Sequence, residues 1–253
     1  MIHLKSAKEI ALIRASCRLA AETMAVVMEH VRPGITTGRL DEIAEQFIRR
    51  QGAEASAKGY RGYPRSICVS VNDEVVHGIP GDRVLAEGDV LAVDIAVKKD
   101  GYHGDMNVTF PAGPIDPERE RLLRVTREAM EVGIAAAVAG NRLGDLGHAI
   151  QSHVEAEGYS IVREYCGHGL GRSFHEDPQV LHFGTPGTGR RLQSGMVFTV
   201  EPMVNQGVPD LRLLDDGWTA ITLDGKLSAQ FEHTIAVGPG GPEILSRFDD
   251  LPF

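Results

Sequence analysis

Apolar residues recur at helical spacing in four segments of the chain. In each segment they lie three or four positions apart and are interrupted by charged residues, which is the pattern of a helix with one buried face. The segments are residues 5–30, 37–51, 117–139 and 143–157. Gly34 and Gly52 flank the second segment as a turn and a C-cap would, and Gly140 and Gly158 flank the fourth. The pattern therefore predicts four amphipathic helices.

Runs of alternating and β-branched residues follow each pair of predicted helices, and they predict strands. The strands are expected at 66–71, 89–98, 102–110, 160–165, 196–204, 218–223 and 227–237. Asp100-Gly101 joins two of these runs and is typical of a two-residue hairpin turn, and Asp224-Gly225 predicts a second hairpin. No run reaches the roughly twenty apolar residues that a membrane span requires.

The two halves of this pattern resemble each other. The segment EGDVLAVDIAV (87–97) aligns with SGMVFTVEPMV (194–204), so that Asp94 falls over Glu201. This predicts an internal repeat, about 5–110 and 117–237, within a single domain of residues 1–253. Because no Pro/Gly/Ser-rich linker separates the halves, we expect an α/β fold in which both share one curved antiparallel sheet with helices on its outside.

Both aligned strands place a carboxylate in an apolar run. Burying an ionised carboxylate without a partner is costly, and no Lys or Arg lies within seven residues of Glu201. If the first hairpin turn forms, Asp94 opposes Asn107, and Asp105 becomes its diagonal neighbour about 7–8 Å away at the backbone. The strand after the second turn carries Glu232. We therefore expect two acid pairs, one from each half, to face one cavity.

Four carboxylates in one cavity repel one another unless protons or cations separate them. Two divalent ions would balance the four charges, and the stretch YCGHGLGRSFHEDP supplies His168 and His175 to complete the set. An oxygen-rich ligand set suits Mn, Fe or Co better than a thiolate-type zinc site. Two metals that share carboxylates can activate water and polarise a carbonyl, which is the equipment for amide hydrolysis.

Composition narrows the possible functions and the expected cellular location. With 26 Lys and Arg against 35 Asp and Glu, the net charge of −9 disfavours a nucleic-acid binder. The cysteines Cys17, Cys68 and Cys166 are odd in number and lack zinc-type pairing, so no disulfide framework is expected. The N-terminus is typical of an amphipathic helix rather than a signal peptide, so we expect a cytoplasmic protein.

Five motifs resemble those of the methionine aminopeptidases, in the short type I form seen in bacteria. They occur in family order as GYPRSICVSVNDEVVHGIP, DVLAVDIAVKKDGYHGDMNVTF, CGHGLGRSFHEDPQVLHFG, GMVFTVEPM and SAQFEHT. The resemblance implies the pita-bread fold, with its pseudo-two-fold duplicated halves. It also implies removal of the N-terminal methionine from nascent polypeptides whose second residue is small. We expect a monomer without a membrane or nucleic-acid partner, and contact with the ribosome stays open.

Carried over residue by residue, the resemblance implies a site with several parts. Two divalent ions, Co, Mn, Fe or Zn, would be held by Asp94, Asp105, His168, Glu201 and Glu232. The catalytic groups would be His77, His175 and Glu201, with Glu201 as general base and His175 near the scissile carbonyl. The substrate methionine would contact Tyr60, Cys68, Phe174 and Trp218 as well as both histidines. A monovalent cation would lie near Asn72, Glu74 and Ser228.

Two departures from the family pattern and two other functions stay open. Arg61 stands where relatives often have a histidine, and Met106-Asn107 stand where many have small hydroxyl residues. These changes bear on substrate preference and on the hydrogen bonds around the ligands. The alternatives are a proline-specific aminopeptidase of the same fold and a peptide-binding relative that has lost catalysis. His30, His103 and His153 carry no functional assignment.

Overall fold

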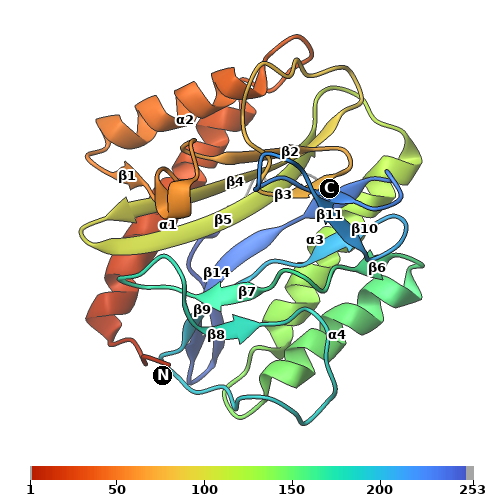
Figure 1. The fold of residues 1–253 in the computed structure, drawn as a ribbon. Helices are drawn as coiled ribbons and strands as arrows, with labels where there is room; N and C mark the ends of the chain where they lie inside the picture. Colours follow the sequence, from red (N-terminus) through yellow and green to blue (C-terminus); the bar gives the residue numbers. More distant parts are fainter. Residues whose placement is uncertain (1, 249–253) are drawn as a thin grey trace.

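The computed structural model describes residues 2–248 as an α/β fold around a curled antiparallel sheet (Figure 1). The central path of the sheet runs β1-β4-β5-β14-β9-β7-β8, with β2 paired to β4 and β15 paired to β14. Its strands are Glu54–Ala55 (β1), Cys68–Val71 (β2), Val90–Lys99 (β4), Tyr102–Pro111 (β5), Gly167–Gly169 (β7), Glu176–Val180 (β8), Val197–Val200 (β9), Glu232–Gly238 (β14) and Gly241–Ile244 (β15). The expected curved antiparallel sheet is confirmed.

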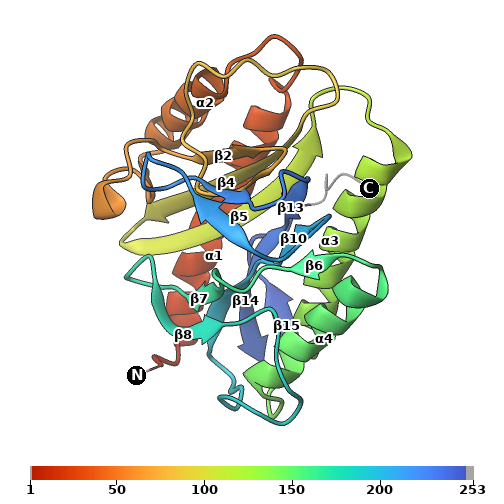
Figure 2. The ribbon, with the colours of Figure 1, turned by 45° about the vertical axis from the view of Figure 1, so that its right-hand side comes forward.

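Two small sheets complete the strands. One contains Ser228–Gln230 (β13), Met203–Asn205 (β10) and Ser160–Ile161 (β6), and the other contains Leu211–Leu213 (β11), Ala220–Thr222 (β12) and Glu74–Val76 (β3). Figure 2 shows β10 and β13 between the β4–β5 hairpin and helix α3 (Pro117–Ala136). The small sheets therefore build the middle of the molecule, next to the main sheet.

The four predicted helices are confirmed and lie on the outside of the sheet (Figure 1). They are Ala7–Met28 (α1), Thr37–Arg50 (α2), Pro117–Ala136 (α3) and Leu143–Ala156 (α4), and a short 3-10 turn spans Tyr60–Gly62 (η1). Ser6 and Glu9 form a reciprocal capping box at the start of α1, and Asp116 caps α3. No helix within residues 2–248 is long and apolar enough to cross a membrane.

The first hairpin has the register that its turn predicts. Asp94 lies opposite Asn107, and Ala96 lies opposite Asp105. Asp100 and Gly101 take positive φ angles of 50° and 77°, as a two-residue turn with matching twist requires. At Gly104 the backbone of α1 rests directly on β5, because a Cβ there would lie 2.2 Å from the amide nitrogen of Cys17.

The second predicted hairpin is wrong. Strand β12 pairs with β11 and β3, whereas β13 pairs with β10. A local turn is present, since the Thr222 hydroxyl donates to the Lys226 carbonyl at 2.8 Å. The Thr222 amide, however, donates to the carbonyl of Asp73. The strand before the turn, β12, therefore belongs to the sheet of β3, whereas the strand after the turn, β13, pairs with β10 in the other small sheet.

Several predicted strands in the second half are shorter than expected. The run at 196–204 is interrupted at Glu201-Pro202, and the run at 227–237 is interrupted at Phe231. Of the run at 160–165, only 160–161 form a strand. Strands β7 and β8 are not predicted from the sequence, because glycines and charged residues in them hide any alternating pattern. The predicted repeat of 5–110 and 117–237 within one domain stays a prediction.

Candidate active site

A cavity of about 290 Å³ opens among the sheet strands and the loops above them. Every residue predicted for metal binding, catalysis or the methionine pocket lines it: Tyr60, Cys68, His77, Asp94, Asp105, His168, Phe174, His175, Glu201, Trp218 and Glu232. Arg61 also lies on its wall. The structure thus brings these side chains together from both halves of the chain, while their individual roles stay predictions.

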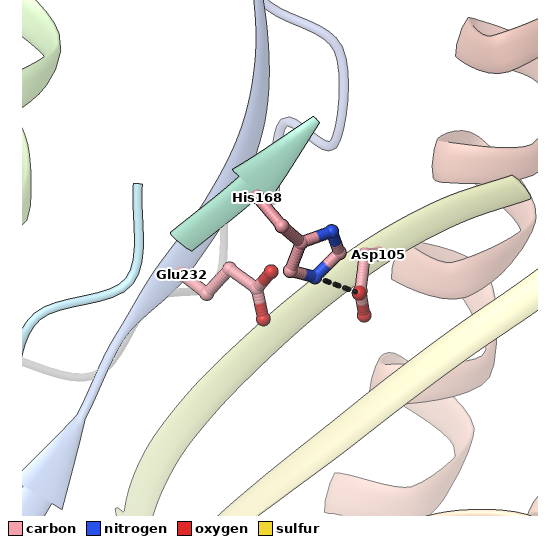
Figure 3. A group of neighbouring side chains, drawn as sticks. All are labelled: Asp105, His168 and Glu232. Carbon is pink, nitrogen blue, oxygen red and sulfur yellow. Dashed lines mark ion pairs between the residues drawn. The ribbon is translucent and has the colours of Figure 1, made fainter. Parts of the chain in front are cut away.

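Three of the predicted ligands converge from three strands of the main sheet, β5, β14 and β7, with β9 between the last two. Figure 3 shows Asp105 of β5, His168 of β7 and Glu232 of β14 pointing toward one another. A ligand atom from each lies within 4.8 Å of the other two. The His168 ring donates through Nδ1 to the carbonyl of Gly169 at 3.0 Å, because a carbonyl only accepts. When the ring is neutral, Nε2 therefore carries the lone pair that a metal would need, and this atom lies 3.5 Å from Oδ2 of Asp105.

The other two predicted ligands come from β4 and from the end of β9. Asp94 sits within β4, opposite Cys68 of β2. Glu201 directly follows β9, and its Oε1 lies 3.9 Å from His168 Nε2. Each oxygen of the Glu201 carboxylate has one donor: the Thr199 hydroxyl reaches Oε1 at 2.5 Å, and the Gln230 amide reaches Oε2 at 3.2 Å.

The carboxylate cluster lacks compensating positive charge. No Lys or Arg within residues 2–248 forms an ion pair with any of its four acids, and only His168 is near enough to do so. Oδ1 of Asp105 and Oε1 of Glu232 are buried without a hydrogen-bond partner. Buried oxygens without donors are rare in folded proteins, and divalent cations would satisfy them. The donor set therefore fits a metal centre of carboxylates and one imidazole.

Burial and mutual repulsion perturb the acids of this cluster. Burial, followed by repulsion from Asp105 and Glu201, raises the pKa of Asp94 well above its usual value. The same causes, with burial again the largest, raise the pKa of Glu232. Burial also raises the pKa of Glu201 to about 7, although His168 and Thr199 oppose the shift. Strongly shifted pKa values of this kind are typical of ionisable groups at functional sites.

Aromatic rings form the wall of the cavity above the acids. Tyr60 stacks on His175 at 5.1 Å between ring centroids and meets Phe174 edge-on at the same distance. Trp218 meets His77 edge-on at 6.1 Å. Aromatic and thiol groups pack well against a thioether, and the thiol of Cys68 lies on the same wall.

His77 has two features typical of a functional position. Its φ is 60°, which is uncommon for a residue with a Cβ and indicates backbone strain. Burial lowers the pKa of its imidazole to about 4. Burial and the neighbouring His168 likewise lower the pKa of His175 to about 3. Both rings are therefore neutral at pH 7 and can donate a hydrogen bond without adding charge.

Several residues around the site were missed from the sequence. Thr199 and Gln230 each lie two positions from a predicted ligand, so strand alternation could have placed them on the same face. His182 had no such signal, yet its Nε2 accepts the backbone N–H of Glu201 at 3.1 Å. Tyr63 also lines the cavity and meets Trp218 edge-on at 5.1 Å.

The residues predicted around a monovalent cation lie close to one another. The amide of Ser228 donates to the carbonyl of Asn72 at 2.9 Å. The carboxylate of Glu74 accepts the amide of Val71 at 2.7 Å.

His103 is buried, pairs through Nδ1 with the Ser56 hydroxyl at 2.8 Å and does not line the cavity. It was not assigned a function from the sequence.

Comparisons with known proteins identify the family. Residues 11–239 match metallopeptidase family M24. Methionine aminopeptidase 1 of Bacillus subtilis is 50% identical over 247 residues, which cover 98% of this chain and all of that protein. The methionine aminopeptidase of Escherichia coli is 47% identical over 252 residues, covering 98% of this chain and 96% of that one.

Solved structures agree with this result. The crystal structure of methionine aminopeptidase from Rickettsia prowazekii matches with a TM-score of 0.97 and 45% identity, covering 98% of this chain and 100% of that one. The prolidase from Pyrococcus horikoshii is 22% identical, with a TM-score of 0.79 over 65% of its length, and shows the shared pita-bread fold alone. The comparisons therefore favour the methionine aminopeptidases over the proline-specific alternative. This chain belongs to metallopeptidase family M24 and, within it, to the methionine aminopeptidases, which are peptide-bond hydrolases.

Proposed function

We propose that this protein removes the N-terminal methionine from polypeptides whose second residue is small, with the help of two divalent metal ions. The observation that carries the proposal is a cluster of four carboxylates and the His168 imidazole within one cavity, in which no Lys or Arg among residues 2–248 forms an ion pair with these acids. Its aromatic and thiol walls suit a methionine side chain. The free α-amino group of the substrate would bind beside the carboxylates, which would restrict cleavage to the first peptide bond.

The residues that would hold the ions are Asp94, Asp105, His168, Glu201 and Glu232. Asp105 and Glu232 each have a buried oxygen without a hydrogen-bond donor, which a bound ion would satisfy. Asp94 would bind one ion, and His168 with Glu201 would complete the other. When bound, divalent ions lower the pKa of water and polarise the scissile carbonyl.

The protein's own groups would bind, orient and exchange protons with the substrate. Glu201 would accept the proton of the attacking water, and the donors Thr199 and Gln230 hold its two oxygens in a fixed orientation. His175 would donate a hydrogen bond to the carbonyl oxygen as negative charge develops there. His77 would contact the substrate amide from the wall that it shares with Trp218.

The setting of the reaction is also part of the proposal. We expect a cytoplasmic monomer that acts on nascent polypeptides. A monovalent cation near Asn72, Glu74 and Ser228 would stabilise the loop that leads to His77.

A peptide panel tests the function. The purified protein, treated with chelator and then reloaded separately with Co, Mn, Fe or Zn, is assayed on Met-Ala, Met-Lys and Ala-Pro peptides. We expect chelation to abolish activity, at least one metal to restore it, and only Met-Ala to be cleaved efficiently. Cleavage of Ala-Pro in preference to Met-Ala, or full activity after complete removal of metal, would contradict the proposal.

A further inference from the structure

One turn carries two residues of the proposed site, and an ion pair with a buried lysine holds this turn outside the cavity. Residues 170–176 form the turn, which presents Phe174 and His175 to the cavity. Glu176 follows directly. Its Oε1 accepts the backbone N–H of Ser173 at 3.1 Å, and its Oε2 lies 2.5 Å from the ammonium of Lys5. A residue near the N-terminus thus reaches the support of the active-site turn.

Lys5 occupies a closely fitted place. Its side chain is only 3% exposed, although lysines are seldom buried. Its backbone N–H donates to the carbonyl of Gly195 at 2.7 Å, which anchors the segment before α1. Gly171 leaves room for the ammonium, since a Cβ there would lie 2.5 Å from Nζ of Lys5 and 2.9 Å from Oε1 of Glu176. The pair therefore has little freedom to move.

Ring contacts hold the side chains of Phe174 and His175. The backbone of the turn is fixed by the N–H of His103, which donates to the carbonyl of Gly171 at 2.8 Å, and by the pairing of Glu176 with Gly169. Phe174 stacks on His103 at 5.6 Å with an interplanar angle of 8°, and the ring of His175 lies 4.0 Å from that of His168. Ring contacts of this kind permit sliding, whereas a hydrogen-bonded ion pair fixes a backbone position. The Lys5–Glu176 anchor adds a charged side-chain constraint at the residue that directly follows His175.

We propose that Lys5 and Glu176 are positioning residues that set the place of Phe174 and His175 for catalysis. The inference rests on the proposed function of these two residues. Neither Lys5 nor Glu176 lines the cavity, so both act through the turn. Since misplacement of a catalytic group by about 1 Å costs up to about 100-fold in rate, loss of the anchor should reduce turnover without removing any group of the site.

The test compares K5M with R14M as a matched control. Arg14 also tethers the N-terminal helix, through an ion pair at 2.8 Å to Glu243, but this pair is solvent-exposed and outside the cavity. Steady-state kinetics on a Met-Ala peptide are measured with the metal-loaded enzyme at 25 °C. We expect K5M to lose about tenfold or more in kcat/KM, through both a lower kcat and a higher KM. R14M should stay within twofold of the wild type.

A second readout does not depend on activity. Amide hydrogen exchange by mass spectrometry should show faster exchange at 170–176 in K5M than in R14M, and K5R should return both exchange and kinetics toward the wild type. G171A keeps both charges but displaces the ammonium, so it should act like K5M and replaces that variant if K5M does not fold.

The outcomes separate the two proposals. Wild-type kinetics and exchange in both K5M and G171A would overturn the positioning role. A uniform loss of thermal stability with unchanged kcat and KM at 25 °C would also overturn it, because that is the effect of a purely structural pair. If the wild type itself does not cleave Met-Ala, the proposed function fails, and exchange at 170–176 still decides whether Lys5 anchors the turn.

Discussion

The first half of the sheet carries its acids within an unbroken hairpin, whereas the second half carries them beside breaks in its strands. Asp94 and Asp105 lie inside the continuous β4–β5 ladder. Glu201 follows the last residue of β9, and Glu232 is the first residue of β14. The two halves therefore each present two carboxylates to one cavity by different structural means.

The difference shows that a strand break must be compensated by side chains. In the first half the backbone groups beside the acids are paired by the ladder itself. At the second-half break, the N–H of Glu201 instead donates to a ring nitrogen of His182, and Thr109 bonds both backbone groups of Gln230. The position of Glu201 depends on hydrogen bonds that single substitutions can remove.

The largest expected effect is at the break itself. E201Q keeps the size of the side chain but removes the proposed base and one anionic ligand, so kcat should fall by about 100-fold or more. Steady-state kinetics and metal analysis by atomic emission measure the change. E243Q, which removes an exposed carboxylate on β15, should retain wild-type activity. Near-wild-type turnover in E201Q would remove Glu201 from the proposed mechanism.

Loss of the side chain that pairs the broken strand should chiefly affect stability. H182A leaves the Glu201 N–H buried without an acceptor, which should lower the free energy of unfolding by about 2 kcal/mol. Chemical denaturation measures this, with the exposed His148 changed to Ala as the control. Equal stability of the two variants would show that another group satisfies the break.

A smaller effect is expected where the first half supports the second. The amide of Asn107 donates to Oε1 of Gln230 at 2.9 Å, which turns the Gln230 amide nitrogen toward Glu201. N107A frees this amide to rotate, so kcat should fall about fivefold to tenfold, equivalent to about 1 kcal/mol. N141A on the surface is the control. An unchanged kcat in N107A would indicate that Thr199 alone orients Glu201.

The smallest effect concerns the loop that carries Trp218. Oδ1 of Asp216 accepts the amides of Trp218 and Thr219, each at 2.8 Å. Partial burial opposes the shift, but these bonds and that of the Thr219 hydroxyl lower the pKa of Asp216. Since this carboxylate is largely exposed, D216N should lower the free energy of unfolding by less than about 1 kcal/mol at pH 7.

The sign of this pH dependence follows from the lowered pKa. The stabilisation by Asp216 is complete above the unfolded-state value of about 3.9 and is lost as the pH falls through the lower folded value. Asp41 accepts two backbone amides in the first half, but burial raises its pKa. Its contribution to the free energy of unfolding therefore falls as the pH rises, opposite to that of Asp216. Denaturation of wild type and D216N between pH 7 and 3 should show a converging difference. A constant difference would exclude the carboxylate charge as its source.

The contrast between the continuous first hairpin and the interrupted strands of the second half also explains what could be predicted from the sequence. The register of β4–β5 followed from Asp100-Gly101 and strand alternation, because local turn chemistry fixes a two-stranded ladder. The turn at Asp224-Gly225 carried the same signal, but its flanking strands pair with distant segments. Turn chemistry does not specify such partners. The interruption after Glu201 did have a local sign, since Pro202 lacks the N–H that a ladder requires.

The site itself was more predictable than its supports. Asp94 and Glu201 are charged residues in apolar runs, and such residues stand out in a single sequence. Asp105 followed from the register of the first hairpin. His182, Lys5 and Glu176 act through contacts between segments far apart along the chain. No periodicity or motif brings such residues together, so they required the folded structure.

The close approach at Gly104 has a consequence for chemistry as well as for packing. Since Gly104 has no side chain, the backbone of α1 packs directly against β5, and the helix and the hairpin form one rigid unit. Asp105, the next residue, is thereby braced by a helix that supplies no group to the cavity. Glycine at position 104 thus contributes to reactivity because it has no Cβ. A larger residue there would separate α1 from β5 and leave Asp105 more freedom to move.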